Sequence, residues 1–545
     1  MRMKKYFFLL LSLFCLIMQG QNNHDSISSA SYLSDFDLFT NYLEQTHPDP
    51  YTAFGGKIYF RKTVQEVREQ IKNIQSVDEF EQILRNLLVR LEDGHTFIYA
   101  SSKKKNLSVQ AKFLPLTFKT ATDGLFVART TENYKKYVGY KLIAVDGITT
   151  DSLAKRMRVI APIENKYGAW NVLENVIAHQ KGAQKLLKKE RVENLCLTLQ
   201  NRVNNIENIT VELEEKFTFT PISQEMNLNE GNGLLSYRLL PDCNAAYFRW
   251  NAIASREIFI EADSTDKETN RAINWLYGIM KRPKPKNFTE TIDGLPELYG
   301  TFYRMLTEMK ENKLEYLIVD LRKNGGGMTP LCMPLLYMLY GNDYLNYRSD
   351  AEYHTLISPL LLKKYKTTLE KFNQKEGKDY KMGDYVFSPF FPYKDIPLSQ
   401  KQTDLSLISY ENGTGKQYTI NLKGRPVYRP HVIVLSSPAT FSAAYHFMYF
   451  LTEIGNATVI GVPSSQAGNT YMESTRFELP YSGIAGSISN AIQIMFPNDE
   501  EKGHVFIPTY PMTINDYAKY NFVEDAEILY CLDLIKQGKI LQKQQ

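Results

Sequence analysis

The chain of 545 residues has little cysteine and almost no excess charge. Five cysteines occur, and the four beyond the first twenty residues are far apart: Cys196, Cys243, Cys332 and Cys531. Such wide spacing is not that of a small disulfide scaffold. The 64 Lys and Arg residues nearly balance the 60 Asp and Glu residues. This balance gives no indication of a polyanionic partner, and we expect no nucleic-acid binding.

Hydrophobic runs long enough to cross a membrane are missing. The apolar stretch 6–18 has thirteen residues, whereas a membrane helix needs about 20. Positive charges within residues 2–5 precede it, and the small residue Gly20 follows it. This pattern is typical of a secretory signal peptide over residues 1–20, with cleavage near Gly20–Gln21. We therefore expect a secreted or periplasmic protein without a transmembrane helix in the mature chain.

Lipid attachment is a second interpretation of the N-terminus, because Cys15 lies at the end of the apolar stretch. Phe14 occupies the position where a lipoprotein signal needs a small residue, which disfavours this interpretation. Removal of residues 1–20 takes away three basic residues and no acid, leaving 61 basic against 60 acidic residues. Association with the cell envelope stays open at this point.

Metal-binding motifs are also missing. The chain has no HExxH sequence, and its eight histidines do not pair with acids at ligand spacing. Three glycines, Gly325–Gly327, follow a short apolar stretch at 316–319 that reads as a buried strand. No lysine follows them in a P-loop pattern, which disfavours phosphate binding. Such a loop either presents backbone amides to an oxyanion or is a plain flexible turn. We expect no metal and no cofactor.

Ser442 is the candidate nucleophile. It lies between an apolar run at 432–435 and a helical pattern that starts at Ala443. A serine at such a junction exposes its hydroxyl, and the following amides of the helix N-terminus are free to stabilise an oxyanion. Serine is also a common helix N-cap, and the segment alone does not separate the two interpretations.

His95 is the candidate general base. It follows a tight Asp93–Gly94 turn, after a helical run that ends at Leu91. A histidine held by such a turn can face a cleft and exchange protons near neutral pH. A lone histidine is more often structural or solvated, so its role depends on the other segments.

Together the segments resemble the C-terminal-processing and tricorn-type serine peptidases. The similar stretches occur in the family's order and cover most of the chain: EQTHPDPY at 44–51, DGHT at 93–96, VDLRKNGGG at 319–327, TFSAAY at 440–445, VIGVPSSQAGNTY at 459–471 and GHVFIPTYPMTINDY at 503–517. The resemblance implies a crotonase-like catalytic domain in a multidomain α/β protein. It also implies polypeptide substrates and acyl transfer through Ser442, with an oxyanion hole from Ala443, Gly326 and Gly327.

The sequence departs from the tail-processing branch of that family at its catalytic lysine. Ala467 stands at the matching position, and no lysine lies between Ser442 and Lys502. The resemblance therefore points to the histidine-based, tricorn-like branch, with His95 as the base. In that branch a serine precedes the histidine, whereas this chain has Gly94.

Other departures leave the activity of the site open. Many relatives have a glutamate where this chain has Tyr445, and an aspartate where it has Thr509. The branch uses a glutamate to orient the catalytic network. Glu501 or Glu500 lies in the expected region, and each can equally be a solvated surface acid.

The mature chain divides into three parts. Residues 21–107 form an N-terminal helical region that carries the DGHT turn. Residues 108–218 are similar to a PDZ domain, although a generic β-hairpin explains their central motif at 139–147 too. Residues 230–545 show the α/β pattern of the catalytic domain. Two long polar segments, 255–297 and 349–424, are expected to be loops at the cleft.

The leading hypothesis is an exported serine peptidase that cleaves polypeptides through an acyl-enzyme. A peptide- or ligand-binding protein without catalytic activity is the alternative, because the departures weaken the catalytic set and fold does not fix function. Hydrolysis of a small ester or amide by the same residues is a third possibility. Ser442 and His95 together favour the first.

Overall fold

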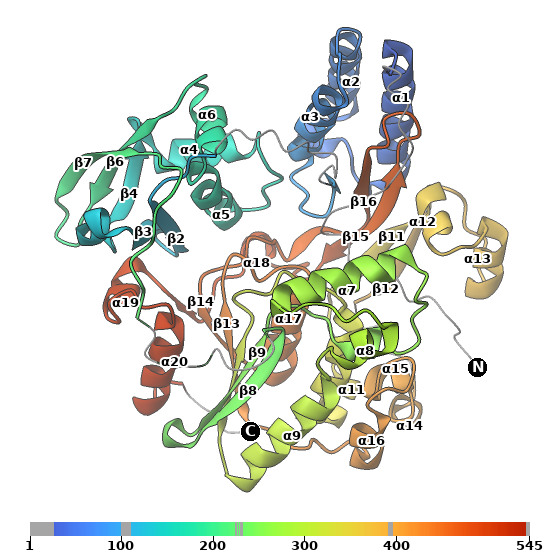
Figure 1. Cartoon of the computed structure of the whole chain (residues 1–545). Helices are drawn as coiled ribbons and strands as arrows, with labels where there is room; N and C mark the ends of the chain where they lie inside the picture. Colours follow the sequence, from blue (N-terminus) through green and yellow to red (C-terminus); the bar gives the residue numbers. More distant parts are fainter. Residues whose placement is uncertain are drawn as a thin grey trace.

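The structure is a computed structural model that describes residues 27–99, 111–223, 226, 228, 233–390 and 396–540. The expected signal peptide and Cys15 lie outside the described residues. Helices and three β-sheets make a mixed α/β architecture (Figure 1). Among the described helices, none combines the length and the apolar character that a bilayer span requires.

A six-stranded sheet forms the centre of the catalytic part. Its order is β17-β14-β13-β10-β9-β8, and all neighbouring strands are parallel except the β8–β9 pair. The strands are β8 (Leu235–Leu240), β9 (Ala245–Trp250), β10 (Tyr316–Asp320), β13 (His431–Ser436), β14 (Thr458–Gly461) and β17 (Tyr510–Pro511). Continuous apolar runs form β9 and β10 because both faces of a parallel sheet are buried. The strands predicted from these runs are confirmed.

Helices cover both faces of this sheet. Alternate residues of β10 point to opposite faces: Leu317 and Val319 pack in one core, and Ile318 in the other. The first core contains residues of α7 (Lys267–Met280), α8 (Phe288–Asp293), α9 (Tyr299–Glu311), α10 (Cys332–Tyr340), α11 (Asn342–Asn346) and α17 (Ala443–Gly455). The second contains residues of α19 (Ile514–Ala518) and α20 (Ala526–Lys536).

A second, antiparallel sheet joins the N-terminal helices to the catalytic part. Its path is β1-β16-β11-β12, with β15 also paired to β16. The strands are β1 (Phe97–Ile98), β11 (Glu352–Leu356), β12 (Tyr385–Pro389), β15 (Asn469–Glu478) and β16 (Ala485–Ile494). The helices α1 (Ser29–Thr46), α2 (Lys57–Ile71) and α3 (Val77–Leu88) share a hydrophobic core with Phe477 and Ile488 of this sheet.

The third sheet lies in the middle part of the sequence and is antiparallel. Its order is β2-β3-β4-β6-β7, with β5 paired to β4. The strands are β2 (Leu116–Ala121), β3 (Gly124–Thr130), β4 (Lys141–Val145), β5 (Ile148–Thr149), β6 (Asn194–Gln200) and β7 (Ile206–Glu212). The helices α4 (Thr150–Met157), α5 (Lys166–Ile177) and α6 (Gln180–Leu187) pack in its core. Its likeness to a PDZ domain stays a prediction.

The expectation of two long loops is wrong. Residues 255–297 contain α7 and α8, and residues 349–424 contain several short elements. These are β11, α12 (Pro359–Lys364), α13 (Leu369–Glu376), β12, α14 (Leu398–Lys401), α15 (Leu405–Ile408) and α16 (Lys416–Thr419). The side chains of Asp266, Ser358 and Thr368 cap α7, α12 and α13. Polar caps and short apolar faces therefore make helices in segments whose overall composition resembles loops.

Shorter helical turns complete the described chain. The helix α18 (Glu500–His504) follows β16, and 3-10 helices are at Thr52–Phe54, Val89–Leu91, Glu132–Tyr137, Pro241–Cys243, Arg256–Ile258, Thr329–Leu331 and Ile420–Leu422.

Candidate active site

Ser442 occupies a strained turn between β13 and α17. Its φ of 53° and ψ of −125° are unfavourable for any residue with a side chain, and such backbone costs about 1–3 kcal/mol. The residue stands at the N-cap position of α17, yet its side chain makes no capping hydrogen bond. The N-cap interpretation therefore fails, and the sharp turn resembles those that expose a nucleophilic serine.

Gly326 packs directly against this turn. A Cβ on Gly326 would lie 2.6 Å from the Ser442 Cβ and 2.9 Å from the Ala443 nitrogen, and its φ is 103°. Asn324 holds the two segments together, because its carbonyl accepts the Phe441 N–H and its side chain donates to the Trp250 carbonyl. The glycine-rich loop is therefore a close-packed wall of the site and not a free turn.

Two backbone amides near Ser442 are available to an oxyanion. Among the described residues, the N–H groups of Ala443 and Gly327 have no hydrogen-bond acceptor. The Gly326 N–H donates instead to Asn324 Oδ1 at 2.9 Å. Of the two glycine amides predicted for the oxyanion hole, the one at Gly327 is uncommitted.

Gln466 supports Ser442 from the loop after β14. The Ser442 N–H donates to Gln466 Oε1, and both residues are buried. Ser464 accepts the Gln466 N–H at 2.9 Å and itself donates to the Thr440 carbonyl. No sequence motif singled out Gln466, because a glutamine in a polar loop carries no chemical signature of this role.

His95 lies in the same region as Ser442. Its ring stacks on the ring of Phe441, with centroids 5.0 Å apart and an interplanar angle of 26°. The side chain is 5% exposed, and neither ring nitrogen has a hydrogen-bond partner among the described residues. Ser442 Oγ likewise has no such partner there, so no hydrogen bond joins the two groups in this state.

The turn that carries His95 is fixed on both sides. The His95 N–H donates to Asp93 Oδ1 at 2.8 Å, and the His95 carbonyl accepts from Ser474 Oγ at 2.9 Å. A Cβ on Gly94 would lie 2.7 Å from the Phe441 ring. This contact leaves no room for the serine that precedes the histidine in the tricorn-type relatives.

Burial and charge act in opposite directions on His95. Burial lowers the pKa of the imidazole below its usual range, while the negative charges of Asp93 and Glu473 partly oppose this shift. Asp93 is fully buried, which alone would raise its pKa, but hydrogen bonds with His47 and Thr96 hold that pKa at about 2. The site thus holds a carboxylate beside an imidazole that favours its neutral form.

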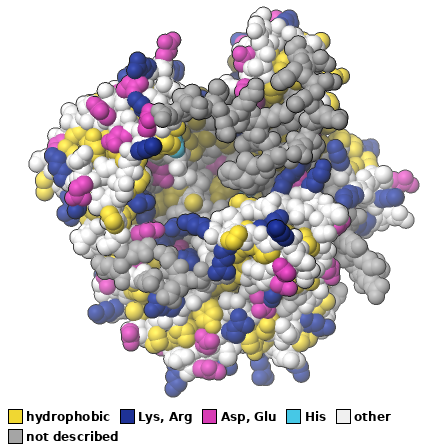
Figure 2. All heavy atoms as spheres, in the orientation of Figure 1, with side chains coloured by type: hydrophobic (Ala, Val, Ile, Leu, Met, Phe, Trp, Pro, Cys, Tyr) yellow, Lys and Arg dark blue, Asp and Glu magenta, His cyan; other side chains and the backbone are white. Residues whose placement is uncertain are grey.

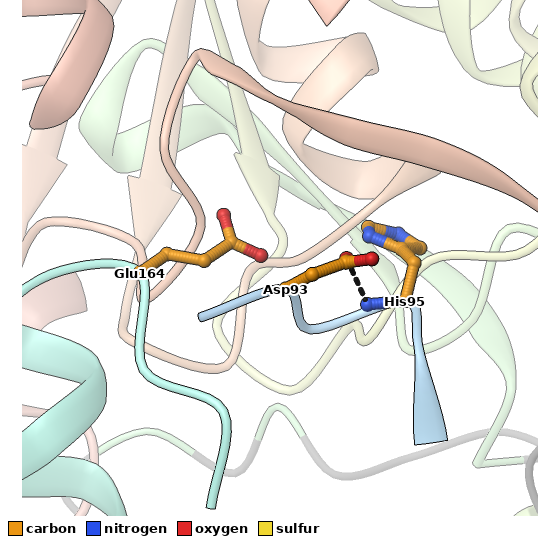
Figure 3. Close-up of side chains that lie close together, drawn as sticks. All are labelled: Asp93, His95 and Glu164. Carbon is orange, nitrogen blue, oxygen red and sulfur yellow. Dashed lines mark hydrogen bonds between the residues drawn. The ribbon is translucent and has the colours of Figure 1, made fainter. Parts of the chain in front are cut away.

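Glu164 is a buried acid that the sequence analysis missed. It precedes α5 and accepts the Gly94 N–H at 3.1 Å and the Ala467 N–H at 2.8 Å. Figure 3 shows its carboxylate pointing toward Asp93 and His95 from the middle part of the chain. Burial raises the pKa of Glu164 to about 8, and the charge of Asp93 adds to this shift.

The predicted acids and the positions that depart from the family pattern lie in different elements around Ser442 and His95. Glu500 and Glu501 are exposed on α18, and no contact with His95 is found for either, so their predicted role stays untested.

Tyr445 is buried, and its hydroxyl lies 3.0 Å from the position that a Cβ on Gly468 would take. Thr509 accepts the Val459 N–H at 3.2 Å. Ala467 contributes only its backbone, through the bond to Glu164.

A serine in a strained turn, uncommitted backbone amides and a nearby histidine are features that serine hydrolases share. Residues 286–494 match the model of a family described as peptidase family S41. This part of the chain is therefore similar to a family of serine-type peptidases. The matched range contains the glycine-rich loop and Ser442, whereas His95 and Glu164 lie before it.

Similar solved structures are found at low sequence identity. Mature CPAF is 15% identical, with a TM-score of 0.52, over 93% of this chain and 98% of that chain. Mature CPAF complexed with lactacystin is also 15% identical, with a TM-score of 0.50, over 93% and 99%. The photosystem II D1 C-terminal processing protease is 11% identical, over 89% and 94%, with a TM-score of 0.36. Comparison with curated proteins gives no significant match.

Proposed function

We propose that this peptidase cleaves polypeptides through a covalent acyl-enzyme on Ser442. The observation that carries the proposal is the strained backbone of Ser442, which is held against the glycine-rich loop beside two uncommitted amides. Strain of this kind persists only where the surrounding structure enforces it, and it is common at catalytic nucleophiles.

His95 is the general base in this proposal. It takes the proton from Ser442 Oγ as that oxygen attacks the peptide carbonyl, and later gives a proton to the leaving amine. Its low pKa favours the neutral imidazole that can accept this proton. Because Ser442 and His95 share no hydrogen bond in this state, the two side chains approach each other to complete the pair.

The amides of Ala443 and Gly327 stabilise the oxyanion of the tetrahedral intermediate. Loss of one such donor typically costs about 3–4 kcal/mol of transition-state stabilisation. Gly326 contributes differently from the expectation, because its amide is bound to Asn324. Its role is to let the loop approach the Ser442 backbone, which only a residue without a side chain allows.

The acid that supports His95 is proposed to be Asp93 and not Glu501 or Glu500. The Asp93 charge favours the imidazolium that forms during catalysis. Its carboxylate fixes the backbone of the turn rather than the ring, through the bond to the His95 N–H. Glu164 is a positioning residue that links this turn to the loop of Gln466 through Gly94 and Ala467.

Export and a polypeptide substrate complete the proposal. The N-terminal pattern over residues 1–20 supports export. Figure 2 shows a hollow between the middle sheet and the helices α1–α3, with hydrophobic side chains on its floor. An open, partly apolar hollow suits an extended peptide better than a closed small-molecule pocket does.

Labelling with a fluorophosphonate probe tests the proposal without a known substrate. The parent protein is compared with Ser442→Ala, His95→Ala and the exposed control Ser264→Ala. We expect labelling of the parent and the control, and its loss in the other two variants. A folded parent that stays unlabelled would favour the binding-protein alternative.

A further inference from the structure

The strongest unexplained feature is the cluster of Asp93, His95 and Glu164. Each residue offers one ligand atom, and these three atoms lie within 4.8 Å of one another in a buried environment. We propose that the cluster is an inhibitory site for a divalent transition-metal ion of the zinc type. The inference rests on the proposed role of His95 and adds a regulation of the same site.

The ring of His95 supplies the observation that points to a ligand. Its two nitrogens are buried and have no hydrogen-bond partner among the described residues. A buried polar atom without a partner loses the interactions that it makes in water, which is unfavourable. A metal ion would satisfy one nitrogen, because the neutral imidazole is the form that binds metals.

The charges of the cluster also favour a cation. Two carboxylates lie close together in a buried environment. Among the described residues, neither forms an ion pair with a Lys or Arg side chain. A bound divalent ion would stabilise both carboxylates in their ionised form.

The surrounding hydrogen bonds are those of a supported metal site. Asp93 Oδ2 accepts from His47 and Thr96, and the Glu164 oxygens accept the amides of Gly94 and Ala467. Such outer partners orient metal-binding carboxylates in known sites. Glu164 comes from a different segment than the turn that carries Asp93 and His95.

The donor set selects the type of metal. One imidazole nitrogen with two carboxylate oxygens suits zinc and its neighbours, whereas magnesium and calcium prefer oxygen ligands alone. Two ligands of a tetrahedral zinc ion are about 3.4 Å apart. The present separation of up to 4.8 Å is wider, so binding draws the three side chains together.

Metal binding would block the proposed reaction. The metal occupies a lone pair of the His95 ring and holds the ring toward the carboxylates, so that the imidazole no longer accepts the Ser442 proton. Removal of the metal with a chelator restores the base without any covalent change.

Calorimetric titration of the metal-free full-length protein with zinc chloride tests the site directly. We expect one binding site in the parent, at least tenfold weaker binding in Glu164→Gln and in His95→Ala, and no change in His504→Ala. His504 is an exposed histidine and controls for surface binding. Thermal unfolding of each metal-free variant confirms that it is folded.

Fluorophosphonate labelling with and without zinc provides the second measurement. We expect zinc to suppress labelling of the parent at least tenfold, EDTA to restore it, and magnesium to have no effect. Equal zinc affinity in the parent and Glu164→Gln overturns the inference, as does full labelling of the zinc-saturated parent.

The two proposals fail in different ways. Labelling of the metal-free parent without any zinc binding disproves the metal site and leaves the peptidase mechanism intact. Zinc binding that depends on Glu164 and His95, in a protein that never reacts with the probe, supports the metal site and disproves the mechanism.

Discussion

The backbone of Ser442 shows how much of this site depends on a single residue's conformation. Its φ of 53° is an angle that glycine adopts without strain and that strains a serine. The surrounding contacts from Gly326 and Gln466 enforce that conformation. The protein therefore gives up stability at the position of the proposed nucleophile.

This strain predicts opposite effects on stability and activity. Ser442→Gly and Ser442→Ala both remove the hydroxyl and should abolish probe labelling. Ser442→Gly should be more stable than Ser442→Ala by about 1 kcal/mol, because glycine adopts the turn without the strain of a Cβ. Thermal unfolding of the two variants side by side measures the difference. Equal stabilities would mean that the turn relaxes when the hydroxyl is removed.

A matched pair of glycines tests the close approach of the glycine-rich loop. In Gly326→Ala the new Cβ would meet the Ser442 Cβ and the Phe441 carbonyl, so we expect labelling to fall at least a hundredfold. In Gly325→Ala nothing lies within 4 Å of the new Cβ, and near-parental labelling is expected. Comparable losses in both variants would assign the effect to loop stiffness and not to the contact with Ser442.

Sequence reasoning found residues with a chemical signature and missed those that act through geometry. Ser442 and His95 stand in recognisable segments, and the structure places both beside Phe441. Glu164 stands in a segment without a motif, and Gln466 stands in a family-like stretch that indicates no role for it; their positions near the site arise only when distant loops meet. An acid such as Glu501, which a family pattern suggested, lies on an exposed helix instead.

At the scale of elements, the loop after β14 connects the nucleophile to the middle part of the chain. Asn165 caps α5 through the N–H groups of Tyr167 and Gly168, and its side chain also donates to the Ser464 carbonyl at 3.0 Å. The same loop carries Gln466, which accepts the Ser442 N–H. The start of α5 therefore helps to hold the turn of the nucleophile.

Gln466→Ala tests this connection. The variant leaves the Ser442 N–H buried without its acceptor, which costs about 1–3 kcal/mol and frees the turn to relax. We expect at least a tenfold slower rate of probe labelling with a modest decrease in melting temperature. Gln537→Ala, at an exposed position after α20, serves as control. An unchanged labelling rate in Gln466→Ala would show that the other contacts suffice to hold Ser442.

The elements that sequence reasoning predicted best are those with continuous apolar runs. The strands β9, β10, β13 and β14 match such runs because a strand that is buried on both faces needs apolar residues at nearly every position, and this pattern is visible in the sequence. For residues 349–424 the sequence predicts a loop, since the apolar faces of the short helices there are only a few residues long. The pairing of β1 with β16, nearly 390 residues away, has no local signal at all.

At the scale of the whole molecule, a buried ionic network joins the middle sheet to the catalytic part. Glu527 on α20 pairs with Lys119 on β2 at 2.6 Å and with Arg322 after β10 at 2.6 Å. Arg322 also pairs with Asp320 at 2.7 Å, at the end of the central strand β10. One segment of the middle part and two distant segments of the catalytic part thus meet at one carboxylate.

Removing that carboxylate should lower the stability of the folded protein. Glu527→Gln leaves Arg322 with Asp320 as its remaining partner, so the cost should stay below the loss of about 3–5 kcal/mol that is typical when a buried charge loses its only partner. We expect a clear decrease in melting temperature at pH 7. Glu524→Gln is the matched control, because its pair with Lys323 is largely exposed and contributes about 0.5 kcal/mol or less.

The same network predicts a pH dependence with a definite sign. Burial alone would raise the pKa of Glu527, but Lys119 and Arg322 lower it from 4.5 to about 2. Because the folded state releases this proton more readily than the unfolded state, the stabilisation is complete above about pH 4.5 and is lost toward pH 2. The melting temperature of the parent should therefore fall across this window. In Glu527→Gln the fall should be smaller, since the variant has no proton to bind at that position, and parallel curves for the two proteins would rule out Glu527 as its source.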